Sequence, residues 1–244
     1  MESTIGMRTA SKQPRVWLFD LDNTLHNASQ AAFAGINEGM TAYMVRELTI
    51  ERTEADALRH RYWLRYGATL LGLVRHHGVK AAHFLHHTHL LEGLEERVLG
   101  HPHDFAALAR LPGRKYILTN APRAYAERVL GALGIGALFD GLLLIEDMRM
   151  FGQLRPKPDA RMFKRIAVKL GVAPSRCVLV EDTLVHQKAA RRVGIVTVWM
   201  QRWTRQAAKD ITPSAKVGVY LHRKPAYVCA RISSLQQLRK RRLP

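Results

Sequence analysis

Short apolar runs alternate with amphipathic segments in the second half of the chain, and this alternation limits the fold more than any other feature. Four runs have the length of strands, at residues 116–118, 142–145, 177–180 and 195–200. Segments with helical spacing separate them and end at glycines, namely Gly134, Gly171 and Gly194. Strands that are joined through helices pair in parallel. The pattern therefore predicts an α/β protein with a mostly parallel sheet and helices on both faces.

A block with helical spacing and without a convincing strand lies between an earlier apolar run, Val16–Phe19, and this alternation. We expect its helices at residues 31–48, 50–66, 69–77 and 80–89. Residues 26–111, the helical block, are therefore interpreted as an insertion after the first strand. The remainder, residues 1–25 and 112–244, is expected to form one discontinuous core.

Composition is typical of a folded globular protein. The chain has 244 residues, of which 47% are hydrophobic. Two cysteines, Cys177 and Cys229, are too few for a disulfide framework, which favours a reducing compartment. The first fifteen residues lack the apolar centre of a secretory signal, and no apolar stretch approaches the ~20 residues of a membrane helix. We expect a cytoplasmic protein with no membrane partner.

The net charge of the chain is unusually positive. Lys and Arg number 38 against 20 Asp and Glu, a formal charge of +18, and residues 239–242 are the densest basic cluster. Such an excess attracts polyanions, so nucleic-acid binding is one interpretation. The other is a positive solvated surface that also draws small anions. The second is favoured because the basic residues are spread along the chain and the zinc-finger and RNP patterns are absent, so no dedicated nucleic-acid site is expected.

Polar side chains follow the predicted strands at the points where they end. Asp20 and Asp22 follow the first run, Thr119 and Asn120 the second, and Glu181 and Asp182 a later one, while Lys157 precedes a predicted helix. Each has a structural alternative, such as an ordinary turn or a solvated helix start. However, the carboxyl ends of parallel strands share one edge, so we expect these groups to converge there. Two close carboxylates would then require a cation or a shared proton.

Taken in order, these residues resemble the four motifs of the haloacid dehalogenase superfamily. The match runs through Asp20-Leu21-Asp22-Asn23-Thr24, then Thr119, then Lys157, then Glu181-Asp182. The resemblance implies a Rossmann-like core with a cap at residues 26–111. Within the superfamily, residues 17–25 and the cap segment 66–73 resemble the pyrimidine 5'-nucleotidase branch. His186 departs from the pattern, because related enzymes often carry Gly or Asn after the acidic motif.

The resemblance also implies a chemistry, phosphoryl transfer. Asp20 would attack phosphorus to form an aspartyl-phosphate, and Asp22 would protonate the leaving oxygen and later accept a proton from water. Thr119, the amide of Asn120 and Lys157 would bind the phosphoryl oxygens. Mg²⁺ would be held by Asp20, the backbone carbonyl of Asp22 and Asp182, with Glu181 acting through water.

Several features leave alternatives open. Tyr66, Thr69 and His76 could face a substrate from the cap or could pack between helices, and the histidines at 83–89 could be solvated rather than a metal site. The expected function is a Mg²⁺-dependent nucleoside 5'-monophosphate phosphatase. The alternatives are a phosphatase for another small ester, such as a sugar phosphate or phosphoglycolate, and a non-catalytic basic protein that binds nucleic acid or protein.

Overall fold

Six parallel strands form the central sheet of the protein. The computed structural model describes residues 15–210, 223–241 and 243–244. The strand order is β3-β2-β1-β6-β7-β8, and every neighbouring pair is parallel. The strands are β1 (Val16–Phe19), β2 (Arg114–Leu118), β3 (Gly141–Leu143), β6 (Cys177–Glu181), β7 (Val196–Met200) and β8 (Ala230–Ile232). The predicted α/β class with a parallel, Rossmann-like sheet is confirmed.

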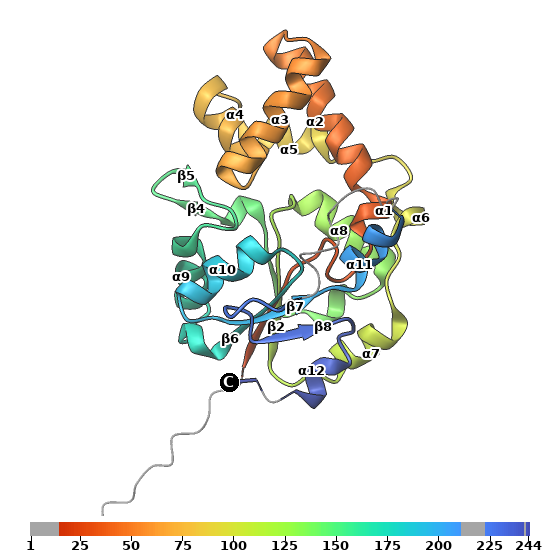
Figure 1. Cartoon of the computed structure of the whole chain (residues 1–244), viewed down its shortest axis with the longest axis vertical. Coiled ribbons are helices and arrows are strands. Elements are labelled where there is room, and N and C mark those ends of the chain that lie inside the picture. The colour runs from red at the N-terminus through yellow and green to blue at the C-terminus, as the bar shows by residue number, and fades with distance from the viewer. Residues whose placement is uncertain (1–14, 211–222, 242) are drawn as a thin grey trace, which may run out of the picture.

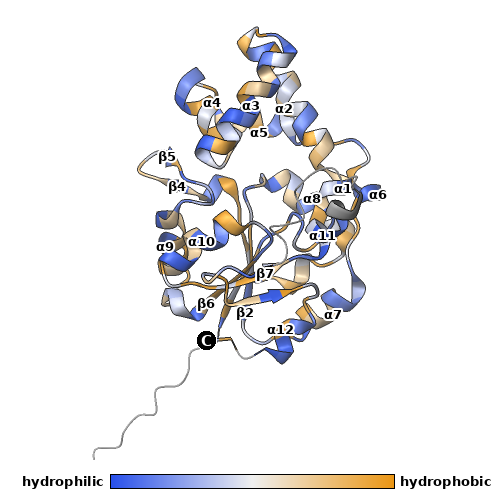
Figure 2. Cartoon of the chain, viewed as in Figure 1, coloured by the Kyte–Doolittle hydropathy of each residue, from blue (hydrophilic) through white to orange (hydrophobic). Residues whose placement is uncertain are grey.

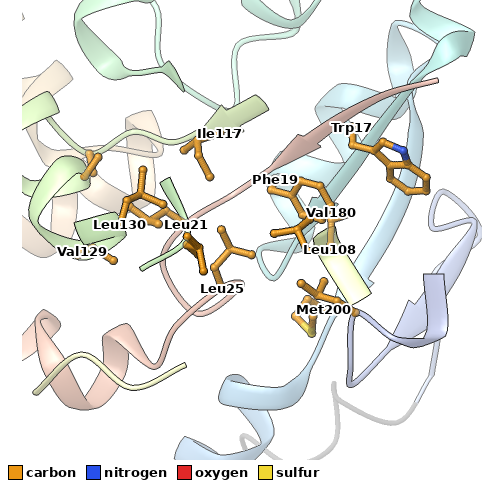
Figure 3. Packing of buried hydrophobic residues seen from close by; sticks show 14 of the residues in the cluster. Trp17, Phe19, Leu21, Leu25, Leu108, Ile117, Val129, Leu130, Val180 and Met200 are labelled. Carbon is orange, nitrogen blue, oxygen red and sulfur yellow. The ribbon is translucent and has the colours of Figure 1, made fainter. Parts of the chain in front are cut away.

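Helices cover both faces of this sheet, as predicted. Successive side chains of a strand point to opposite faces, so Trp17 and Phe19 pack in one apolar cluster and Leu18 in another. The first cluster includes side chains of α8 (Arg123–Leu133), and part of it is drawn in Figure 3. The second includes side chains of α9 (Ala160–Lys169) and α10 (Leu184–Arg192). In Figure 2 the middle of the sheet is mostly hydrophobic, whereas α9 and α10 contain both hydrophilic (blue) and hydrophobic (orange) residues.

Helices between β1 and β2 make up the helical block. They are α1 (Ala28–Ala31), α2 (Phe33–Leu48), α3 (Arg52–Tyr66), α4 (Thr69–His77), α5 (Ala81–Thr88), α6 (Leu94–Arg97) and α7 (Pro102–Ala109). Helices α2 to α5 lie beyond the sheet (Figure 1) and share an apolar cluster that includes Tyr43, Leu73 and Phe84, together with Ile145 from outside the helical block. At Gly72 an added Cβ would overlap the ring of Tyr62, so only glycine permits this approach of α4 to α3.

The remaining elements are short. The strands β4 (Arg149–Met150) and β5 (Gln153–Leu154) form an antiparallel hairpin, and α11 (Arg202–Asp210) and α12 (Gln237–Lys240) lie near the end of the chain. Three 3₁₀ helices span Gly136–Leu138, Ile145–Asp147 and Pro174–Arg176. No described helix has both the length and the apolar character that crossing a membrane requires.

Candidate active site

Three strand ends and one loop bring the predicted polar residues to the carboxyl edge of the sheet. Asp20 follows β1, and its backbone N–H donates to the carbonyl of Val180 on β6 at 3.0 Å. Because β1 and β6 are neighbours in register, Asp20 and Glu181 end up side by side. The predicted convergence of Asp20, Lys157, Glu181 and Asp182 is present in the structure.

Lys157 lies between two of the carboxylates. Its Nζ is 2.6 Å from Oδ1 of Asp20 and 2.7 Å from Oε2 of Glu181, and the side chain is only 1% exposed. Burial works to lower the pKa of Lys157, but the two carboxylates outweigh it and raise that pKa above its usual range. The lysine therefore stays charged where it can neutralise anionic oxygens.

Asn120 holds the backbone of Lys157 in place. The Nδ2 of Asn120 donates to the carbonyl of Lys157 at 2.9 Å, and the N–H of Lys157 donates to Oδ1 of Asn120 at 2.9 Å. The sequence predicted that the amide of Asn120 binds phosphoryl oxygens, whereas in the structure the side-chain amide pairs with the backbone of Lys157. The neighbouring Thr119 is buried, and its hydroxyl accepts the N–H of Ala121 at 3.0 Å.

The carboxylate of Asp20 is also bound by a threonine from its own loop. Oγ1 of Thr24 donates to Oδ2 of Asp20 at 3.0 Å. Burial, reinforced by the charge of Glu181, raises the pKa of Asp20 to about 7, although Lys157 opposes the shift. For Glu181, by contrast, Lys157 and His186 outweigh burial and lower the pKa. Of Asp20 and Glu181, Asp20 is therefore the acid whose ionisation a nearby cation would favour more.

Asp20, Glu181 and Asp182 could hold a metal ion. Each offers a carboxylate oxygen, and these oxygens lie within 4.8 Å of one another. Burial and the charges of Glu181 and Asp20 raise the pKa of Asp182 well above its usual value. Such crowding of hard oxygen donors fits a divalent cation, because the ion would offset both the mutual repulsion and the burial of the charges. The described residues thus fit the predicted metal site.

Asp22 makes a separate set of contacts, away from Lys157. Its Oδ1 accepts the hydroxyl of Tyr125 at 2.7 Å and lies 2.9 Å from Nε2 of His26. Burial favours the neutral acid, but His26 and Tyr125 outweigh it and hold the pKa of Asp22 below its usual value. Burial also raises the pKa of Tyr125, so the phenol keeps its proton.

Sequence reasoning did not assign roles to four of the residues that contact these acids. They are Thr24, His26, Tyr125 and His186, the last with its Nδ1 3.1 Å from Oε1 of Glu181. Thr24 belongs to the motif at residues 20–24, so the sequence could have indicated its contact with Asp20. The other three come into contact only through the packing of loops and helices.

Tyr66, Thr69 and His76, which could face a substrate or pack between helices, make contacts between α3 and α4. Oη of Tyr66 lies 2.5 Å from Nε2 of His76, and the buried hydroxyl of Thr69 donates to the carbonyl of Arg59 at 3.1 Å. The turn between α3 and α4 nevertheless reaches the site. An added Cβ on Gly67 would be 2.8 Å from the ring of Pro158, which follows Lys157.

Comparison with known proteins finds relatives of this chain both in sequence and in fold. In sequence, the chain is 23% identical over 193 residues to phosphate metabolism protein 8 of Saccharomyces cerevisiae, covering 74% of this chain and 60% of that protein. It is 33% identical over 117 residues to phosphoserine phosphatase of Thermus thermophilus, covering 47% and 45%. The chain thus spans less than two thirds of the length of these two relatives.

The fold has relatives among solved structures. A HAD phosphatase from Thermococcus onnurineus superposes with a TM-score of 0.59 at 20% identity, covering 93% of this chain and 96% of that one. The family model for haloacid dehalogenase-like hydrolases matches residues 14–194, which carry the acids and the lysine described above. Since that match covers well over half of the sequence, the chain belongs to the haloacid dehalogenase-like hydrolase family.

Proposed function

We propose that the protein is a Mg²⁺-dependent phosphatase that hydrolyses nucleoside 5'-monophosphates through an aspartyl-phosphate on Asp20. One observation carries the proposal: a buried lysine contacts Asp20 and Glu181 within 2.7 Å, in an acid cluster at the carboxyl edge of a parallel sheet. A nucleophilic carboxylate, a fixed cation and a metal site are the groups that transfer of a dianionic phosphoryl group requires. Membership of a hydrolase family supports the same reaction class.

The residues divide the reaction into two steps. Asp20 would attack phosphorus, and the bond from phosphorus to the ester oxygen would break as Asp22 gives that oxygen a proton. Water would then attack the aspartyl-phosphate, losing a proton to Asp22 and releasing inorganic phosphate. Lys157 and Thr119 would bind the phosphoryl oxygens. The anionic ester favours the protonated form of Asp22, which offsets the low pKa of that acid in the free protein.

Mg²⁺ would be held by the carboxylates of Asp20 and Asp182 and by the backbone carbonyl of Asp22, with Glu181 acting through water. When bound, it would supply positive charge that keeps Asp20 ionised and stabilises the phosphoryl oxygens. Glu181 is already engaged by Lys157 and by the N–H of Thr183 at 3.2 Å, which suits an indirect role.

The choice of a nucleotide rests on the helical block, which we propose acts as a cap over residues 1–25 and 112–244. The segment 66–73 resembles the pyrimidine 5'-nucleotidase branch, and its Gly67 packs against Pro158 next to the site lysine. We propose that the paired side chains of Tyr66 and His76 bind the nucleobase.

Release of inorganic phosphate from a panel of esters tests the proposal. The panel holds nucleoside 5'-monophosphates, sugar phosphates, phosphoglycolate, phosphoserine and an aryl phosphate, each with Mg²⁺ or with EDTA. We expect the highest kcat/KM on a nucleotide and loss of activity in EDTA. A sugar phosphate as the best substrate would overturn the nucleotide assignment, and no release from any ester would overturn the phosphatase.

The nucleophile is tested by Asp20→Asn, which keeps the volume but removes the attacking oxygen. Turnover should fall by at least ~10³ while the fold is kept. The matched control is Asp140→Asn, since Asp140 is exposed and precedes β3 at the opposite edge of the sheet. Chemical trapping should place the phosphoryl label on Asp20. Label on a histidine would show that another residue is the nucleophile.

A further inference from the structure

One oxygen of the Asp22 carboxylate receives two donors and the other receives none. Tyr125 and His26 both contact Oδ1, at 2.7 and 2.9 Å. Within the described residues, no hydrogen bond reaches Oδ2. We propose that Tyr125 and His26 are positioning residues that fix the orientation of Asp22 and make Oδ2 the oxygen that exchanges its proton with the substrate. This inference rests on the proposed function, in which Asp22 is the acid–base group.

The number of donors decides which oxygen can carry a proton. A phenol O–H and an imidazole N–H that both point at Oδ1 occupy its lone pairs. A proton on that oxygen would have to displace one of them, leaving a buried donor without a partner, which costs about 1–3 kcal/mol. The proton of the neutral acid therefore belongs on Oδ2.

His26 is suited to a permanent donor role. Its side chain is 0% exposed, and its Nδ1 is buried without a hydrogen-bond partner in the structure. The ionised carboxylate of Asp22 can only accept, so the ring nitrogen that faces it, Nε2, has to carry the hydrogen. The tautomer with the hydrogen on Nε2 is thus favoured, and that hydrogen points to Oδ1 of Asp22.

Tyr125 is fixed from both sides. Its ring packs in the apolar cluster that α8 forms with the sheet and is 1% exposed. The other neighbour is His89 at the end of α5, whose ring lies 5.6 Å from the Tyr125 ring at an interplanar angle of 72°. The phenol therefore has one position, and the helical block helps to define it. This arrangement orients Asp22 before the substrate arrives, which lowers the cost of reaching the reactive geometry.

Tyr125→Phe removes the hydroxyl and keeps the ring. A nucleotide has a poor alkoxide leaving group that needs the proton of Asp22, whereas an aryl phosphate has a good leaving group that does not. We expect kcat for the nucleotide to fall about 10²-fold and kcat for the aryl phosphate to fall less than about threefold, with KM unchanged for both. The control is Tyr43→Phe, which loses a phenol contact to His83 in the helical block and should change neither.

A second pair of variants tests His26. His26→Gln can still donate from its Nε2 and should keep more nucleotide activity than His26→Leu, while both keep activity on the aryl phosphate. The melting temperature of each variant shows that it is folded. Equal falls on the two esters, or no fall with Tyr125→Phe, would overturn the inference while Asp20→Asn still supports the phosphatase. A wild-type protein that hydrolyses neither ester would overturn the proposed function and this inference with it.

Discussion

Lys157 is the residue on which the charge balance of the site depends. It is the fixed cation in contact with Asp20 and Glu181, and the half-buried Asp182 adds a third carboxyl group. Removing one partner of a buried ion pair leaves an uncompensated charge, which typically costs about 3–5 kcal/mol. We expect Lys157→Met to lower the free energy of unfolding by about that amount at neutral pH, measured by urea denaturation.

The control for this change is Lys164→Met, because Lys164 is an exposed residue of α9. Added Mg²⁺ should restore part of the stability of Lys157→Met, since the ion would compensate the same carboxylates. Equal stability of the two variants without metal would contradict the assigned role of Lys157.

For single residues, the sequence was enough to place the acids and Lys157, but not the side chains that contact the acids. Asp20 and Glu181 could be predicted because a parallel sheet brings strand ends to one edge whatever the side chains around them. Tyr125 lies 103 residues from Asp22 in the chain, and their contact depends on how α8 is rotated against the sheet. A helical pattern alone does not specify that rotation.

Helix α5 is followed by a histidine, His89, whose charge is coupled to folding. Burial lowers the pKa of His89 from 6.5 to about 4, although Asp22 opposes the shift. Between these values the unfolded chain binds a proton that the folded protein does not. The contribution of His89 to the free energy of unfolding is therefore fully present above pH 6.5. It is lost as the pH falls toward 4, by up to about 3 kcal/mol.

His89→Gln cannot titrate, so its stability relative to the wild type should rise as the pH falls from about 6.5 to about 4. Free energies of unfolding measured at several pH values give this difference. His86→Gln is the control, since His86 is exposed on the same helix. A difference between His89→Gln and wild type that stays constant over this range would contradict a His89 that is neutral in the folded protein.

Helices α3 and α4 carry the pair that we assign to the nucleobase. If Tyr66 binds the base, Tyr66→Ala should raise KM for a nucleotide about tenfold and leave hydrolysis of an aryl phosphate nearly unchanged, because remote binding is lost and the chemistry is kept. Steady-state kinetics on both esters measure the effect. Leu64→Ala, a change at an exposed position of α3, is the control. Equal losses on both esters would show that Tyr66 is only a packing residue.

Elements with strong periodicity were predictable, and those defined by tertiary contact were not. The expected helix at 69–77 coincides with α4, while the helix expected at 31–48 corresponds to α2 from Phe33 onward and is divided from Ala31, the last residue of α1. The division lies at Ala32, whose φ of −134° and ψ of −40° are not helical. Strand β8 was not predicted, because it has three residues and is defined by its pairing with β7.

The whole molecule combines a strongly positive charge with a site that concentrates its acids. Of the 20 acidic residues, Asp20, Glu181 and Asp182 are gathered at one sheet edge, while 38 basic residues extend over the chain. A positive field of this kind raises the local concentration of anionic small molecules near the protein. It also attracts nucleic acids, through phosphate contacts that do not depend on base sequence.

Such attraction differs from a dedicated nucleic-acid site in its salt dependence. Each phosphate contact releases a counterion, so the affinity of a diffuse field falls steeply as salt rises. Fluorescence polarisation with labelled duplex DNA and single-stranded RNA should give weak binding at 50 mM salt that decreases at least about tenfold by 200 mM. The unlabelled oligonucleotides should leave phosphate release from a nucleotide unchanged at the higher salt. Saturable binding to one oligonucleotide that persists at 200 mM salt would instead show that the charge serves a specific polyanionic partner.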